Sequence, residues 1–142
     1  MEKVSYPAVT DIRPEWGWVR PIIERILERS PQFTYLPEDV YTACKSGNAQ
    51  FWVNEDGFVI SAIEVDRFTG ERSFFIWLAG AKEIGGDQAL AFDEFFCQVA
   101  LQSGCTRMET RTSVPEVGDH LSNAGWKKDH AVYSQDLKAI KE

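Results

Sequence analysis

The sequence predicts an α+β, sandwich-like fold, in which helices cover both faces of a mixed and mostly antiparallel central sheet. Apolar residues at three- and four-residue spacing predict helices near residues 22–27 and over residues 89–99. Between them lie three short runs rich in β-branched and aromatic residues, joined by turns of a few residues. Because such short turns join consecutive strands in antiparallel order, these runs predict a meander at the centre of the sheet.

Length and composition bound the class of protein. The 142 residues predict a single domain over residues 1–142, and a hydrophobic fraction of 44% excludes a disordered chain. The net charge of −7 argues against binding to nucleic acid or to an anionic membrane, since either would need a basic surface. No apolar run approaches the roughly 20 residues that span a bilayer, and residues 1–5 lack the pattern of a signal peptide. We therefore expect a soluble, cytoplasmic protein.

The first third of the chain combines an extended arm with two helices. Residues 4–12 predict a strand or an extended arm. The first helix presents apolar residues on one side and ends before Ser30-Pro31, because a proline pushes the preceding residue out of the helical region. The second helix begins at Pro37, which is favoured in a first turn, and ends at Gly47.

The remainder predicts strands and helices in alternation. The meander strands are expected at 51–53, 58–65 and 74–78, and a long helix is expected to begin at Asp87. A strand over 107–112 and a short helix ending at Gly125 follow. A last strand is expected over Val132–Leu137. The expected order is therefore β-α-α-β-β-β-α-β-α-β.

This order resembles that of the GNAT superfamily of N-acetyltransferases, from about Ile12 to Leu137. Three stretches carry the resemblance: the helix that ends in Ser46-Gly47 and leads into Phe51-Trp52-Val53, the meander with its loop and long helix, and the segment Leu121-Ser122-Asn123-Ala124-Gly125-Trp126. The chain is also similar to small, divergent GNAT-like proteins encoded by tailed bacteriophages. That similarity implies a location in the host cytoplasm or in the virion.

The resemblance implies acetyl-CoA as the acyl donor and a set of residues that hold it. In the family, the pantetheine arm pairs with the exposed edge of one strand, and loop amides at a helix N-terminus receive the pyrophosphate. By position, the corresponding residues here are Ile76, Trp77, Leu78, Lys82, Gly85 and Gly86.

The glycine loop departs from the family pattern in either register. In one register, Ile84 replaces a glycine and Ala81 replaces the first polar residue; in the other, Asp87 places a carboxylate beside the expected pyrophosphate. An alternative interpretation is that Gly85-Gly86-Asp87 is only a turn and a helix cap. The departure puts tight binding of CoA in doubt.

Three residues are predicted to carry the proton transfers of an acyl transfer. Glu64 is the predicted base: alternation places it at the end of an apolar row with Phe58, Ile60 and Ala62, where desolvation would raise its pKa. The alternative is that the strand ends there and the carboxylate reaches solvent. The position that holds a tyrosine acid in the family is Leu121 here, so His120 and Tyr133 are the predicted proton donors. The alternative, and the commoner situation for such residues, is that His120 is a surface or satisfied residue and that Tyr133 is a packing residue.

Charged residues alternate along the strand expected at 107–112. Arg107, Glu109 and Arg111 share one face, which predicts either an open cleft that receives an acidic group or a self-paired charge ladder. Cys44, Cys97 and Cys105 lack the paired spacing of a zinc site, and no metal is expected.

Two functions remain open at this stage. The first is an N-acetyltransferase with a degenerate pyrophosphate loop, acting on a small-molecule or protein amine. The second is a non-catalytic binding or assembly protein on the same scaffold, since a fold does not fix a function. The sequence leaves a protein partner and a homo-oligomer open.

Overall fold

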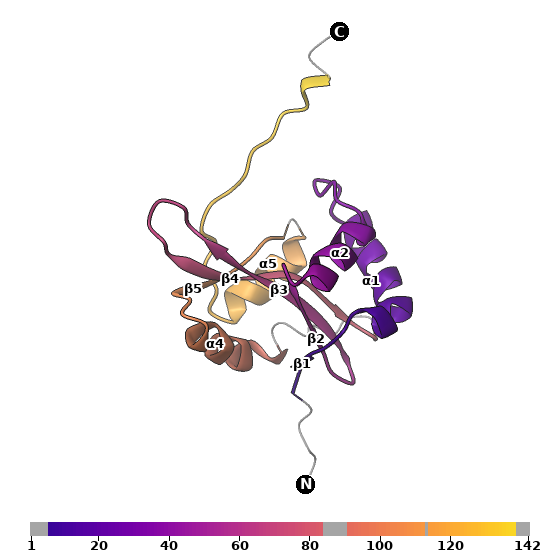
Figure 1. The fold of residues 1–142 in the computed structure, drawn as a ribbon. Coiled ribbons are helices and arrows are strands. Elements are labelled where there is room, and N and C mark those ends of the chain that lie inside the picture. Colours follow the sequence, from indigo (N-terminus) through magenta and orange to yellow (C-terminus); the bar gives the residue numbers. More distant parts are fainter. Residues whose placement is uncertain (1–5, 84–90, 113, 139–142) are drawn as a thin grey trace.

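The computed structural model describes residues 6–83, 91–112 and 114–138, and within them it has the predicted α+β architecture (Figure 1). The elements follow in the order β1 (Ala8–Val9), the 3-10 helix η1 (Arg13–Glu15), α1 (Trp16–Glu28), α2 (Pro37–Ser46), β2 (Gln50–Val53), β3 (Gly57–Val65), β4 (Arg72–Ala81), α4 (Asp93–Gln102), β5 (Arg107–Thr110) and α5 (Pro115–Asn123).

The five strands form one sheet in the order β1-β2-β3-β4-β5. The pairs from β1 to β4 are antiparallel, as the short turns predict, and β4 and β5 are parallel. The parallel pair follows from the long connection that contains α4, since a strand can return parallel to its neighbour only through a crossover. The predicted mixed and mostly antiparallel sheet is therefore confirmed.

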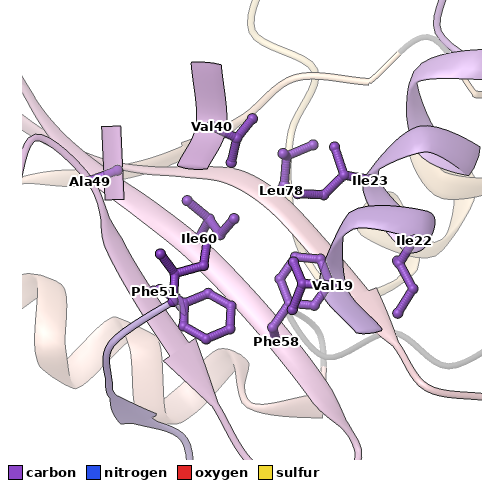
Figure 2. Packing of buried hydrophobic residues seen from close by; sticks show 10 residues of the cluster. Val19, Ile22, Ile23, Val40, Ala49, Phe51, Phe58, Ile60 and Leu78 are labelled. Carbon is purple, nitrogen blue, oxygen red and sulfur yellow. The ribbon is translucent and has the colours of Figure 1, made fainter. Parts of the chain in front are cut away.

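One face of the sheet is covered by α1 and α2. Figure 2 shows Val19, Ile22 and Ile23 of α1 facing the sheet residues Phe58 and Leu78, and all of these are buried. The helix α1 starts at Trp16, six residues before the first isoleucine of the predicted stripe, and contains Pro21. Burial of its apolar stripe offsets the local cost of a proline.

The opposite face is covered by α4. Phe96 of α4 is fully buried and packs against the sheet together with Phe74 and Ile76 of β4 and Val59 of β3. Helices therefore lie on both faces, and the two buried clusters of the described residues are separated by the sheet.

A β-bulge in β4 changes which face its side chains meet. Ile60 pairs with Leu78 but Ser61 pairs with Ile76, so Trp77 is an extra residue opposite β3. Before the bulge, Phe74 and Ile76 face α4; after it, Leu78 joins the cluster under α1 and α2. The alternating pattern of the sequence is interrupted at this one residue.

A Gly80→Ala substitution is expected to destabilise the fold by about 1–3 kcal/mol, because it overpacks the contact between β4 and α1. A Cβ at Gly80 would lie 2.5 Å from the Ile22 side chain and 2.7 Å from the Phe58 ring. Both neighbours are buried and have little room to move. Urea unfolding followed by circular dichroism measures the loss.

The matched control is Gly118→Ala in α5, where an added Cβ meets nothing within 4 Å. Alanine is favoured over glycine inside a helix, so this variant should be as stable as the parent or more so. Equal stability of both alanine variants and the parent would show that β4 and α1 are not in close contact.

The predicted last strand over Val132–Leu137 is wrong. Residues 126–136 have no regular secondary structure, and the chain after α5 leaves the sheet as an extended segment, yellow in Figure 1. The local residues favour a strand, but a strand forms only where a second one supplies hydrogen bonds. Within the described chain, β5 has only β4 as a neighbour.

Candidate functional site

The strands β4 and β5 separate after four paired rows. Their pairing runs from Ser73 opposite Arg107 to Ile76 opposite Thr110, and β5 ends there. The Thr110 hydroxyl donates a hydrogen bond to the Ile76 carbonyl at 2.9 Å, at the last row. Beyond it β4 continues to Ala81 beside β3 alone. We call this divergence the fork.

The fork leaves one edge of β4 open. Over residues 77–81, no strand of the described chain pairs with the side of β4 that faces away from β3. Such an edge presents backbone N–H and C=O groups at strand spacing, which an extended ligand with amide groups can pair with. The backbone of β4 over residues 77–81 is therefore paired on the side of β3 alone.

The structure places the predicted cofactor residues at different points of this edge. Ile76 lies in the last paired row, Trp77 is the bulged residue just beyond it, and Leu78 points into the cluster under α1 and α2. Gly85 and Gly86, the glycines of the predicted pyrophosphate loop, lie outside the described residues.

Lys82 is occupied by contacts on the α1 side. Its backbone N–H donates to the Asp56 carbonyl at 2.8 Å, which extends the hairpin of β3 and β4. Its ammonium group lies 4.7 Å from the centre of the Trp18 ring, in a cation–π contact. The Trp18 indole in turn donates to Glu15.

Tyr35 is a residue of the site that sequence reasoning missed. Its ring meets that of Trp77 edge to face, with the ring centres 5.4 Å apart. Its hydroxyl oxygen is buried, and it finds no hydrogen-bond partner among the described residues. Burial raises the pKa of Tyr35, while the neighbouring Trp77 acts in the opposite direction. The phenol is therefore a protonated donor at neutral pH beside the bulge. The two aromatic residues Phe33 and Tyr35, in the connection between α1 and α2, were the sequence signal that could have pointed to it.

Glu64 lies on the predicted sheet face but is not desolvated. The residues that precede it on this face, Phe58, Ile60 and Ala62, do belong to the cluster under α1 and α2. Its side chain is 45% exposed and pairs with Arg111 at 3.0 Å. The alternative that the carboxylate reaches solvent is the one observed. By register, Glu64 lies three rows from Ser61, which is opposite Ile76, or about 10 Å along the strand.

The charges on β5 form the predicted ladder rather than an open cleft. Arg111 contacts Glu109 at 2.7 Å, and its guanidinium lies 4.2 Å from the centre of the Phe75 ring. At the other end, Arg107 pairs with Asp129 at 2.9 Å and with Glu109 at 3.8 Å. The guanidinium groups are thus matched by carboxylates.

The two predicted proton donors, His120 and Tyr133, are both exposed and lie on different segments. His120 is exposed on α5. Tyr133 is 93% exposed on the extended segment after α5, because the strand expected to carry it does not form. Of the three predicted catalytic residues, none contacts Trp77 through an interaction that the structure records.

Two hollows of the described surface lie elsewhere. One, of about 650 Å³, is on the outer side of α4 beside Tyr6 and Phe95, and the other lies beside Asp11 and Cys44. Burial raises the pKa of the Cys44 thiol to about 11, which makes it a poor nucleophile at neutral pH. Among the described residues, no group of three His, Cys, Asp or Glu side chains could hold a metal ion, and no helix could cross a membrane.

The whole fold is similar to the folds of several solved acetyltransferases. The chain superposes on a ribosomal-protein-alanine N-acetyltransferase from Brucella melitensis biovar Abortus 2308 with a TM-score of 0.67 and 15% sequence identity, over 92% of this chain and 99% of that one. It superposes on an acetyltransferase from Trypanosoma brucei with a TM-score of 0.63 and 11% identity, over 94% and 100% of the two chains.

A third similar structure is an aminoglycoside acetyltransferase from an uncultured soil metagenomic sample, with a TM-score of 0.66 and 10% identity, over 94% of this chain and 95% of that one. The chain has the fold of GNAT acetyltransferases. The GNAT-like fold predicted from the order of elements is therefore confirmed over almost the entire chain. No family model matches the sequence, and no curated protein matches it either.

Proposed function

We propose that this chain transfers an acetyl group from acetyl-CoA to the nitrogen of an amine. The observation that carries the proposal is the fork, which leaves the edge of β4 open over residues 77–81 in a GNAT-type sheet. A sheet closed along its full length would offer no such edge. The proposal also accounts for the bulge at Trp77, since bulges commonly occur where a strand ends its pairing or faces a site.

The open edge fits an extended donor with amide groups in its arm. The backbone of Trp77 and Leu78 would pair with these amides as a neighbouring strand does, which fixes the direction of the donor along β4. When bound, acetyl-CoA supplies a thioester carbonyl that an uncharged amine can attack. Gly85, Gly86 and Lys82 stay our candidates for the phosphate end. Lys82 would have to leave the Trp18 ring to take part.

Tyr35 is our candidate proton donor. Its hydroxyl is buried, protonated at neutral pH and without a hydrogen-bond partner in the described part of the chain. Burial favours the protonated phenol, and the edge-to-face contact with Trp77 places its ring beside the bulge of β4. We infer that Tyr35 Oη donates to the departing sulfur.

Glu64 stays the candidate base, with Arg111 as the residue that holds its carboxylate. Its place about three rows from the fork favours a role through a water molecule, which can carry the proton from the amine. His120 and Tyr133 stay weaker candidates for the acid, because both are exposed and Tyr133 lies on the segment that leaves the sheet. The net charge of −7 favours approach of a cationic amine.

Binding of acetyl-CoA tests the proposal directly. At a cofactor concentration about 100 times the Kd, binding to the folded state stabilises it by about 2.7 kcal/mol, so the melting temperature rises by several degrees. Differential scanning fluorimetry of the full chain with acetyl-CoA measures the shift. Desulfo-CoA keeps the pantetheine arm and the phosphates but carries no acyl group, so it shows how much of the shift comes from the arm and phosphates. Adenosine alone is the negative control.

The second function, a non-catalytic binding or assembly protein, is favoured by the composition of the loop and of α5. Leu121 stands where the family has a tyrosine. In one register of the loop Ala81 stands where the family has a polar residue, and in the other Asp87 adds a negative charge near the expected pyrophosphate. The absence of any thermal shift at millimolar acetyl-CoA would contradict acetyl transfer and leave this second function, including a role in a phage-encoded assembly.

A further inference from the structure

Next to the fork, the sheet binds a guanidinium group of its own chain. Arg111 is the first residue after β5, and its guanidinium lies over the Phe75 ring of β4, 4.2 Å from the ring centre. Glu109 of β5 contacts this group at 2.7 Å, and Glu64 of β3 contacts it at 3.0 Å. Aromatic faces and carboxylates are groups with which proteins bind cations. The ring and the carboxylates therefore form a cation site, which Arg111 fills.

The cation site and the bulge lie on the same face of the sheet. Phe75 is directly opposite Ala62 in the register, and Ala62 packs against the cluster under α1 and α2. Trp77 and Tyr35 pack against the same cluster. Phe75 precedes Trp77 by two residues on β4, which corresponds to about 7 Å along a strand. The cation site is thus a short distance from the place where the candidate proton donor meets the bulge.

We propose that the acceptor carries a second cationic group, and that Glu109 and Phe75 bind this group in place of Arg111 while the first amine is acetylated beside Trp77. The inference rests on the proposed acetyl transfer and specifies its acceptor as an aliphatic diamine. With carbon–carbon bonds of about 1.5 Å, a chain of about four or five methylene groups spans the distance between the two points. Arg111 keeps its pairing with Glu64, so the candidate base stays in place.

The exchange requires little rearrangement of the fold. Arg111 lies beyond the last paired row of β5, and 53% of its side chain is exposed. Ion pairs at such exposure contribute little to stability, so the guanidinium can leave Glu109 at low cost. Glu109 and Phe75 lie opposite each other in a paired row of the sheet, so both stay in place when Arg111 moves. The ligand cation then meets the Glu109 carboxylate and the uncovered face of the ring.

Steady-state acetyl transfer to 1,5-diaminopentane and to pentylamine tests the inference. The two acceptors have the same carbon chain and differ in the second amine. For the parent chain, we expect the KM of the diamine to be about fivefold lower than that of pentylamine, or lower still. Glu109→Gln removes the carboxylate from the site and should abolish most of this preference. Equal KM values for the two amines in the parent overturn the inference.

The matched control is Glu116→Gln, which removes the same charge from α5. Glu116 is exposed there, 3.9 Å from Arg29, and belongs to neither the fork nor the cation site. This variant should keep the parent's preference for the diamine. Loss of the preference in both variants would trace it to the net charge of the chain and overturn the inference.

An NMR titration with 1,5-diaminopentane in the absence of acetyl-CoA separates this inference from the proposed function. Because Arg111 competes for the same place, Arg111→Gln should bind the diamine about fivefold more tightly than the parent, and Glu109→Gln about fivefold more weakly. These opposite shifts in a chain that transfers no acetyl group would support the cation site and contradict the proposed function. Weaker binding in both variants would show that Arg111 only supports the fold there, which overturns the inference.

Discussion

We expect the Tyr35→Phe variant to lose about 10²-fold in kcat/KM for acetyl transfer, since a positioned proton donor contributes roughly that factor or more. The same change should not lower the free energy of unfolding. The hydroxyl is buried and has no hydrogen-bond partner among the described residues, so its removal relieves an unsatisfied polar group. Activity is therefore expected to fall without a loss of stability. A steady-state assay of thiol release and a urea titration measure the two effects.

The matched control is Tyr41→Phe. Tyr41 is half-buried on α2 and packs against Trp16, with ring centres 5.0 Å apart, on the same face of the sheet as Tyr35. Its replacement should leave kcat/KM within about twofold of the parent value, because Tyr41 takes no part in the proposed proton transfer. Full activity of the Tyr35→Phe enzyme would remove Tyr35 from the reaction, while acetyl-CoA binding would still stand as a separate result.

The pKa of Tyr35 also fixes the direction of a pH effect. Burial raises it above the usual value near 10, so folding favours the protonated phenol. The stabilisation is fully present below the unfolded pKa and is lost as the pH rises through the folded one. Deprotonation of Tyr35 therefore should not lower activity anywhere below about pH 10.

Local pattern was enough to predict the helices and the meander. The second helix from Pro37 to its glycine stop is set by residues within that segment, and Gly47 indeed ends it with a φ of 86°. The face of Glu64 was also predictable, because the extra residue of the bulge lies in β4 and the side chains of β3 still alternate between the two buried clusters. Alternation could not predict how exposed the Glu64 side chain is, because that depends on which elements pack against the end of β3.

The features of the fork depend on contacts between distant segments and could not be predicted from local pattern. The bulge at Trp77 exists because β3 and β4 pair with one residue of mismatch, and no residue type marks that position. Tyr35 lies in a connection whose path is set by how α1 and α2 pack. The segment Val132–Leu137 has residues that favour a strand, but no strand of the described residues pairs with it.

The largest loss of stability is expected for Phe96→Ala, at about 3–5 kcal/mol. Phe96 is fully buried on α4, and its ring meets those of Trp52 and Phe74 at 5.4 Å and 6.2 Å between centres. Its removal leaves a cavity between α4 and two strands of the sheet, which closes only in part. Urea unfolding followed by tryptophan fluorescence measures the change.

The control for this prediction is Leu101→Ala on the same helix, where the side chain is 65% exposed and the change should stay within about 0.5 kcal/mol. Because α4 is the connection that returns the chain from β4 to β5, the Phe96 cavity should also loosen the fork. Acetyl-CoA should then raise the melting temperature of Phe96→Ala less than that of Leu101→Ala. An equal shift in both would show that the packing of α4 does not hold β4 and β5 in place, and that the fork depends on the pairing of the strands alone.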